Sequence, residues 1–189
     1  WVIPSVYCPS TSMSVVYSSA WVGIDGYSNG TVEQIGTETD CNYASLVHYA
    51  WYELYPKYPV RILLAVNPGD TINAEVRYMA NNQYVMTISN QTTGVSYSTT
   101  QKAASAKRQS AEWIVEAPTS AGNPLPLANF GTVNFTNASA TINGVSGSIA
   151  NASWQHDSIT MTGTDGTVKA IPSALDSTGQ AFSDTWQHQ

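Results

Sequence analysis

The chain has 189 residues, of which 42% are hydrophobic and only 11% are charged, and we expect a single domain over residues 1–189. Thirteen Asp and Glu against seven Lys and Arg give a net charge of −6, which argues against a nucleic-acid partner because such partners need a basic face. No apolar run approaches the ~20 residues of a membrane span, so we expect no membrane partner.

The low charge density is compatible with activity in acid. Once the carboxylates are protonated, seven Lys and Arg and three His stay charged, so self-repulsion remains modest. Few ionised carboxylates also means few native ion pairs to lose as the pH falls. An ordinary soluble protein could share this composition, so composition alone leaves both interpretations open.

The two cysteines are compatible with a secreted protein. Cys8 and Cys41 allow one disulfide in an oxidising compartment, with two buried free thiols as the alternative. No basic segment followed by an apolar one is present, so we expect any signal peptide to have been removed. Asn-x-Ser/Thr sequons occur at Asn29, Asn90, Asn134, Asn137 and Asn151, most of them expected by chance.

Short β-type runs alternate with turn signals along the chain. The predicted strands include 14–24, 60–66, 71–80, 83–90 and 148–155. The intervening turn signals include 67–70 (Asn-Pro-Gly-Asp), 92–94 (Thr-Thr-Gly), 143–144 (Asn-Gly) and 165–166 (Asp-Gly). The polar stretch 101–110 is the best helical candidate and is interpreted as a loop. This pattern predicts an all-β sandwich or jelly roll rather than a parallel sheet.

Two predicted strands carry carboxylates beside apolar residues. Strand alternation places Trp51, Glu53 and Tyr55 on one face of the first. In the second, it places Glu112, Ile114 and Glu116 on one face. A carboxylate is costly to bury on such a face, although a solvent-exposed sheet face with ordinary Glu residues is the alternative.

Several chemistries fit these residues poorly. Glycoside hydrolases hold two carboxylates ~5–9.5 Å apart, whereas positions i and i+4 on a strand lie ~13 Å apart, so Glu112 and Glu116 do not form such a pair by themselves. No Gly-x-Ser-x-Gly elbow, His-Glu-x-x-His motif, zinc-finger spacing or phosphate-binding loop is present, so neither a metal nor a cofactor is expected. Water activated by a lone Glu and a non-titrating amide remains possible, but spacing alone does not select the amide.

Four sequence blocks resemble the eqolisins, the family of glutamic peptidases. They are Trp21-Val22-Gly23-Ile24-Asp25-Gly26, Glu33-Gln34-Ile35-Gly36, Trp51-Tyr52-Glu53-Leu54-Tyr55-Pro56 and Glu112-Trp113-Ile114-Val115-Glu116. Weaker similarity at 68–72, 92–94, 129–136 and 181–186 extends the resemblance over nearly all of the chain. One block is weak support, but four in order with compatible gaps are strong support.

The resemblance implies a concanavalin A-like sandwich of two bent antiparallel sheets with a cleft on the concave face. It also implies an acid endopeptidase, insensitive to pepstatin, that acts on polypeptides. The family's catalytic pair falls on Gln34 and Glu116, whereas Glu112 falls on a position with no assigned chemical role. The positions that line or support the cleft fall on Trp21, Asp25, Trp51, Glu53 and Tyr55, with Glu38 where a supporting Asp is common.

The chain departs from the family pattern at two places. Relatives usually have a further N-terminal strand with a Trp-x-Gly element, whereas this sequence starts at Trp1, so either it is trimmed or a sheet edge is missing. Tyr49 stands where some relatives carry an acidic residue. The first difference would alter one cleft wall, and the second affects the predicted hydrogen-bond network and subsites.

The sequence therefore predicts a secreted, monomeric glutamic endopeptidase. Glu116 is expected to be ionised in the free enzyme and to act as general base on a water held by Gln34, although the reverse protonation order stays open. A carbohydrate-binding module and a glycoside hydrolase are the alternatives. The first would bind glycans without hydrolysis, and the second would release reducing sugars and leave casein intact.

Overall fold

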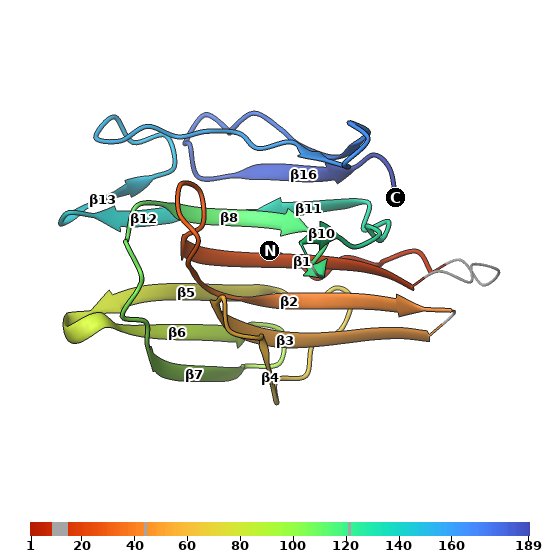
Figure 1. Cartoon of the computed structure of the whole chain (residues 1–189), viewed down its shortest axis with the longest axis horizontal. Helices are drawn as coiled ribbons and strands as arrows, with labels where there is room; N and C mark the ends of the chain where they lie inside the picture. The colour runs from red at the N-terminus through yellow and green to blue at the C-terminus, as the bar shows by residue number, and fades with distance from the viewer. Residues whose placement is uncertain (9–14, 44, 121) are drawn as a thin grey trace.

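The computed structural model describes residues 1–8, 15–43, 45–120 and 122–189 (Figure 1). Within these ranges its only helical element is one 3-10 turn, η1 (Ala80–Asn82), so the predicted all-β class is confirmed. The strands are β1 (Val15–Asp25), β2 (Val32–Asn42), β3 (Ser45–Tyr55), β4 (Val60–Ile62), β5 (Ile72–Met79), β6 (Gln83–Asn90), β7 (Val95–Lys102), β8 (Ala111–Glu116), β9 (Thr119–Ser120), β10 (Asn123–Pro124), β11 (Thr132–Phe135), β12 (Ser139–Ile142), β13 (Val145–Ser148), β14 (Met161–Thr162), β15 (Val168–Pro172) and β16 (Phe182–Trp186).

The strands form three antiparallel sheets and two hairpins. The largest sheet has the order β4-β3-β2-β1-β8, and the others are β5-β6-β7 and β11-β16-β15-β14. The hairpins are β9–β10 and β12–β13. The N-terminal segment joins two of the sheets, because Trp1 and Ile72 exchange backbone hydrogen bonds at one end and the Tyr7 N–H donates to the Asn129 carbonyl at the other. In Figure 1, β16 lies above β8, and β2 and β3 lie below it.

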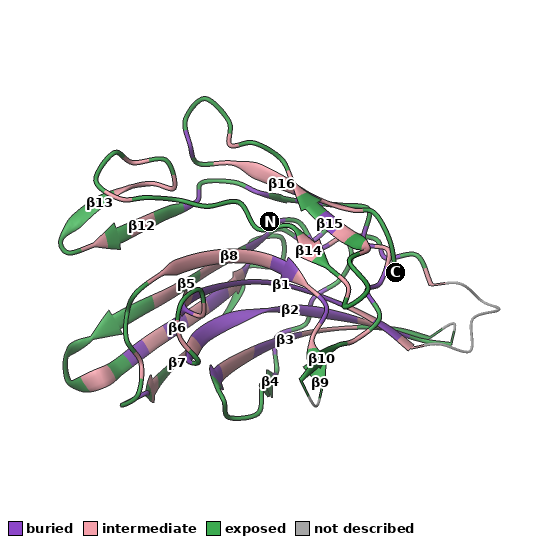
Figure 2. Cartoon of the chain, turned by 45° about the horizontal axis from the view of Figure 1, so that its top comes forward, coloured by how far each residue is buried: buried purple, intermediate pink, exposed green. Residues whose placement is uncertain are grey.

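The main core lies between the five-stranded sheet and the sheet β5-β6-β7. Alternate residues of β1 to β3 point into it and meet apolar side chains of the facing sheet. The buried members include Val16, Ala20, Val22, Ile35, Ala50 and Leu54 on one side, with Ile72, Tyr84, Met86 and Ile88 on the other. Figure 2 shows β1 and β2 buried along most of their length. The remaining residues of β1 to β3 lie on the opposite face of the five-stranded sheet, which points away from this core.

Asn90 ends β6 inside this core with no exposed surface. Its side-chain Nδ2 donates to the Ala65 carbonyl at 3.1 Å and to Asp70 Oδ2 at 2.7 Å. Its Oδ1 accepts from the N–H groups of Thr92 and Thr93 at 3.1 and 3.2 Å. The Asn90 amide thus organises the predicted Thr-Thr-Gly turn.

Several predicted elements match the structure and two do not. The strands 71–80 and 83–90 correspond to β5 and β6, and 14–24 corresponds to β1 except for residue 14, which lies outside the described ranges. The loop predicted at 101–110 begins only at residue 103, because residues 101 and 102 end β7. The strand predicted at 148–155 is wrong, because the Asn151 N–H donates to the Ser148 carbonyl and the Asn151 side chain accepts from Ser153 N, which forms turns. In 60–66 only β4 is a strand, although Leu64 and Val66 are buried.

The disulfide predicted between Cys8 and Cys41 is present, with the two Cα atoms 5.6 Å apart. It ties the N-terminal segment to the end of β2, 33 residues away in sequence. Across the described ranges, no helix has the length and apolar character needed to span a membrane.

Candidate active site

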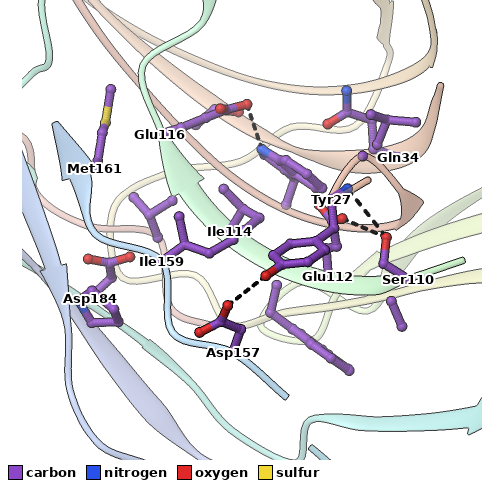
Figure 3. Close-up of a pocket in the computed structure, with 18 of the residues that line it drawn as sticks. Tyr27, Gln34, Ser110, Glu112, Ile114, Glu116, Asp157, Ile159, Met161 and Asp184 are labelled. Carbon is purple, nitrogen blue, oxygen red and sulfur yellow. Dashed lines mark hydrogen bonds between the residues drawn. The ribbon is translucent and has the colours of Figure 1, made fainter. Parts of the chain in front are cut away.

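A cleft of about 1620 Å³ lies over the polar face of the five-stranded sheet. The sheet forms its floor, and segments from the C-terminal part of the chain form the facing wall, including 154–159 and residues of β14 to β16. Figure 3 shows side chains from both sides.

The floor of the cleft consists of three rows of side chains that cross β8, β1, β2 and β3. The strand registers give Glu112–Gly23–Gln34–Glu53, Ile114–Trp21–Gly36–Trp51 and Glu116–Ser19–Glu38–Tyr49. Every member other than the two glycines lines the cleft. The faces predicted from strand alternation in β3 and β8 are therefore confirmed, with Tyr55 also lining the cleft.

Trp21 connects the Gln34 row with the Glu116 row. Its indole Nε1 donates a hydrogen bond to Glu116 Oε1 at 3.0 Å. A Cβ atom on Gly23 would lie 2.9 Å from Cζ3 of the Trp21 ring and 3.3 Å from the Gln34 Cβ. The indole therefore lies over Gly23 beside Gln34 at one end and binds Glu116 at the other. Gln34 and Glu116 are in different rows, and the Trp21 ring lies between them.

The Gln34 side chain is held by Glu53, its neighbour across the β2–β3 pair. Nε2 of Gln34 donates to Glu53 Oε2 at 2.6 Å. This hydrogen bond fixes the orientation of the amide while Glu53 is ionised, because a carboxylate only accepts. Burial raises the pKa of Glu53, and this hydrogen bond partly offsets the rise. Gln34 Oε1 is buried with no hydrogen-bond partner in the described part of the chain. The amide thus keeps its carbonyl oxygen and one N–H for another molecule.

Burial raises the pKa of Glu116 to about 7. The Trp21 hydrogen bond lowers this pKa, and the nearby Glu53 and Glu112 carboxylates raise it. Glu116 is therefore protonated in acid, which differs from the ionised state expected from sequence. The reason is that the sequence does not reveal how far the carboxyl is withdrawn from water.

Glu38 lies in the Glu116 row, separated from it by Ser19. Burial, followed by the charge of Asp40, raises the pKa of Glu38 well above its usual value, and a hydrogen bond with Ser19 lowers it. Tyr49 lies at the end of the row, and burial and the charges of Glu38 and Asp40 raise its pKa. The guanidinium of Arg61 stacks 4.6 Å from the centroid of the Tyr49 ring. The Glu116 row thus contains protonated, hydrogen-bonding groups at acid pH.

Asp25 has no exposed surface and does not line the cleft. Its carboxylate accepts from the backbone N–H groups of Lys107, Arg108 and Gln109 at 2.7 to 2.8 Å and from Asn29 Nδ2 at 3.0 Å. Burial would raise the pKa of Asp25, but these donors outweigh burial and lower it. Asp25 therefore supports the loop that brings residues 109 and 110 to the cleft wall, and it has no free lone pair directed at a substrate.

Sequence reasoning missed several residues of the cleft. Ser19 could have been found, because it shares strand parity with Trp21. Tyr27 and Asp157 could not, because they lie in loops 130 residues apart and meet through a 2.6 Å hydrogen bond from the Tyr27 hydroxyl. Asp184 of β16 also lines the cleft, and its position depends on the packing of the C-terminal sheet.

Comparison with known proteins gives consistent matches. The model of the peptidase A4 family matches residues 1–183. Aspergillopepsin-2 from Aspergillus niger is 36% identical over 132 residues, which cover 67% of this chain and 47% of that protein, so the chain spans about half the length of this curated relative. The crystal structure of aspergilloglutamic peptidase from Aspergillus niger superimposes with a TM-score of 0.78 and 30% identity, covering 91% of this chain and 99% of the other. Scytalido-glutamic peptidase with a transition-state analogue inhibitor gives a TM-score of 0.79 and 25% identity, covering 98% and 89%.

Proposed function

The chain belongs to the peptidase A4 family of eqolisins, and we propose that it is an acid endopeptidase in which Glu116 and Gln34 activate one water molecule without a cofactor. The observation that carries this proposal is the position of Trp21, whose indole lies beside Gln34 and binds Glu116 on the floor of an open cleft. Trp51 and Tyr55 line the same cleft and would orient an extended peptide.

The proposed first step uses the protonated form of Glu116. One carboxyl oxygen gives its proton to the carbonyl oxygen of the scissile peptide, while the other takes a proton from the attacking water. A bond forms between the water oxygen and the carbonyl carbon, so a neutral tetrahedral diol results and Glu116 is again protonated. The remaining N–H of the Gln34 amide donates to the oxygen on which charge develops, and its Oε1 can accept from the water.

The second step breaks the C–N bond. Glu116 donates its proton to the leaving nitrogen and accepts one from a hydroxyl of the diol, which becomes the new carboxylic acid. Because neither step forms a covalent bond to the protein, the mechanism needs no nucleophilic side chain. Since the pepstatin-sensitive enzymes use a pair of Asp residues, which is absent from this proposal, we expect pepstatin to have no effect.

The location and assembly state are part of the proposal. A disulfide persists in oxidising compartments, so Cys8–Cys41 supports secretion. We propose a monomer that acts on polypeptide chains.

Replacement of the two proposed catalytic residues tests this function. Glu116→Gln should abolish casein hydrolysis because its amide cannot exchange the protons, and Gln34→Ala should reduce the rate by on the order of 10²–10³ because one oxyanion donor is lost. Casein digestion across pH 2–7, with and without pepstatin, measures the rates. Circular dichroism controls for folding. Wild-type rates in Glu116→Gln, or release of reducing sugars from glycans while casein stays intact, would refute the proposal.

The pH dependence tests the protonation order. If the protonated Glu116 starts the reaction, activity is present below its pKa of about 7 and is lost as the pH rises through that value. The kcat/KM of a short peptide, measured over minutes to avoid inactivation, should therefore show a descending limb near pH 7. A rate that instead rises up to pH 7 would mean that the ionised form is the active one.

A further inference from the structure

The wall of the cleft opposite the catalytic floor contains a buried carboxylate. Asp184 lies on β16 between Val133 of β11 and Pro172 of β15 and is only 6% exposed. Its Oδ1 has no hydrogen-bond partner in the described ranges, although the residue lines the cleft. A buried carboxyl oxygen without a partner is costly, so this position calls for a ligand.

Apolar side chains lie on the same wall of the cleft as Asp184. Ile159, Met161, Leu175 and Phe182 line the cleft with it. Figure 3 shows Asp184, Met161 and Ile159 on the side of the cavity away from Gln34. The approach to the carboxyl therefore suits a long side chain with an apolar stem.

No charged side chain causes the raised pKa of Asp184. Burial raises its pKa to about 6, and the backbone N–H of Thr185 partly opposes this rise. Among the elements around it, β11 and β14 carry no titratable group, β15 carries Lys169, the 154–159 segment carries His156 and Asp157, and β8 carries Glu112 and Glu116. None of these groups contributes to the raised pKa of Asp184, whose cause is burial.

We propose that Asp184 and the apolar side chains beside it form a subsite for a Lys or Arg side chain of the substrate. This inference rests on the proposed peptidase function and names the side chain that the cleft selects. The methylene groups of the substrate would pack on Met161 and Ile159, and the cation would pair with the unpartnered carboxyl oxygen. Binding of the cation would release the proton of Asp184, so the preference should strengthen as the pH rises from 4 to 6.

Direct binding tests the subsite without turnover. In the Glu116→Gln background, calorimetry compares N-acetyl-Ala-Lys-Ala-amide with its norleucine analogue, which has a similar stem and no charge. At pH 6 the Lys peptide should bind at least about tenfold more tightly. At pH 4, where Asp184 is about 1% ionised against about half at pH 6, the preference should fall by up to about 50-fold.

Two substitutions separate this subsite from general attraction to an acidic cleft. Adding Asp184→Asn should remove the Lys preference, whereas Asp157→Asn, which removes an exposed carboxylate from the cleft rim, should retain it. Equal binding of the two peptides at pH 6, or a preference that survives Asp184→Asn, would overturn the proposal. If Asp184→Asn does not fold, Asp184→Ser and the pH dependence of the parent decide the question.

Failure of the subsite and failure of the peptidase function give different results. A Lys preference in Glu116→Gln, lost with Asp184→Asn, supports the subsite even if the wild type leaves casein intact. Casein hydrolysis by the wild type with no Lys preference supports the peptidase and overturns the subsite.

Discussion

Trp21 is the residue on which the geometry of the proposed site depends most. Its hydrogen bond to Glu116 fixes the carboxyl, and its ring lies against the backbone at Gly23, beside Gln34. Glycine is required at position 23 because the ring occupies the space of a Cβ atom. The identity of one small residue therefore controls the relative position of two larger ones.

Gly23→Ala tests this dependence. The added methyl would meet Trp21 Cζ3 at 2.9 Å, so the ring must move and its bond to Glu116 must lengthen or break. Displacements of about 1 Å in such sites can reduce rates by on the order of 10²-fold, and we expect a fall in kcat of this size with little change in KM. Peptide hydrolysis at acid pH measures it.

Gly30→Ala is the matched control, because a Cβ at Gly30 meets nothing within 4 Å. It should retain wild-type kcat. Full activity of Gly23→Ala would show that the contact between Trp21 and Glu116 is not needed for the reaction.

Among the elements, β2 serves the cleft and the core at once. Gln34 and Glu38 line the cleft, whereas Glu33 points to the other face and is only 1% exposed. Burial, the charge of Asp25 and a hydrogen bond to Asp25 together raise the pKa of Glu33 to about 8, with Arg108 opposing the rise. The pair formed by Glu33 and Asp25 lies beneath the loop that Asp25 holds at residues 107–109.

The stability of the fold should depend on pH through Glu33. Its folded-state pKa of about 8 lies above the ordinary value of 4.5, so its contribution to stability is fully present below pH 4.5 and is lost as the pH rises through 8. Ionised Glu33 would repel Asp25 and weaken the anchor of the loop. We expect the Tm to fall by on the order of 10 °C over this interval and the fall to be smaller in Glu33→Gln, as measured by calorimetry.

The exposed residue Glu75 provides a control, since Glu75→Gln should leave the pH dependence of the Tm unchanged. The same fall in Glu33→Gln as in the wild type would assign the pH dependence to other groups, of which Glu38 is the first candidate because it is also buried with a raised pKa.

Strand alternation predicted the elements of the cleft floor well. The faces of 51–55 and 112–116 follow from a period of two, which does not require knowledge of the partner strands. Periodicity failed at 148–155, where the Asn151 side chain forms turns, and at 60–66, where burial continues without strand pairing. The role of Gln34 came only from the family resemblance, because the register that places it beside Trp21 is a property of the assembled sheet.

At the scale of the molecule, the N-terminal segment links two sheets and is held by the Cys8–Cys41 disulfide. A bond between residues 33 apart restricts the unfolded chain and contributes about 4 kcal/mol by the loop-entropy relation. The double substitution Cys8→Ser/Cys41→Ser should therefore lower the Tm by roughly 8–15 °C, as measured by calorimetry at pH 4.

The wild type with its disulfide reduced is the control, and it should unfold at the same temperature as the double variant. An unchanged Tm in both would mean that the non-covalent contacts of Trp1 and Ile3 hold the segment without the disulfide.

The buried amide of Asn90 has a consequence for biosynthesis. A sugar chain is attached to asparagine through Nδ2, the same atom that binds Ala65 and Asp70 in a position closed to solvent. Attachment during translocation, before β6 is packed, would leave a carbohydrate that the folded interior has no room for. In a eukaryotic secretory pathway, modification of Asn90 before β6 packs would therefore interfere with folding of the chain.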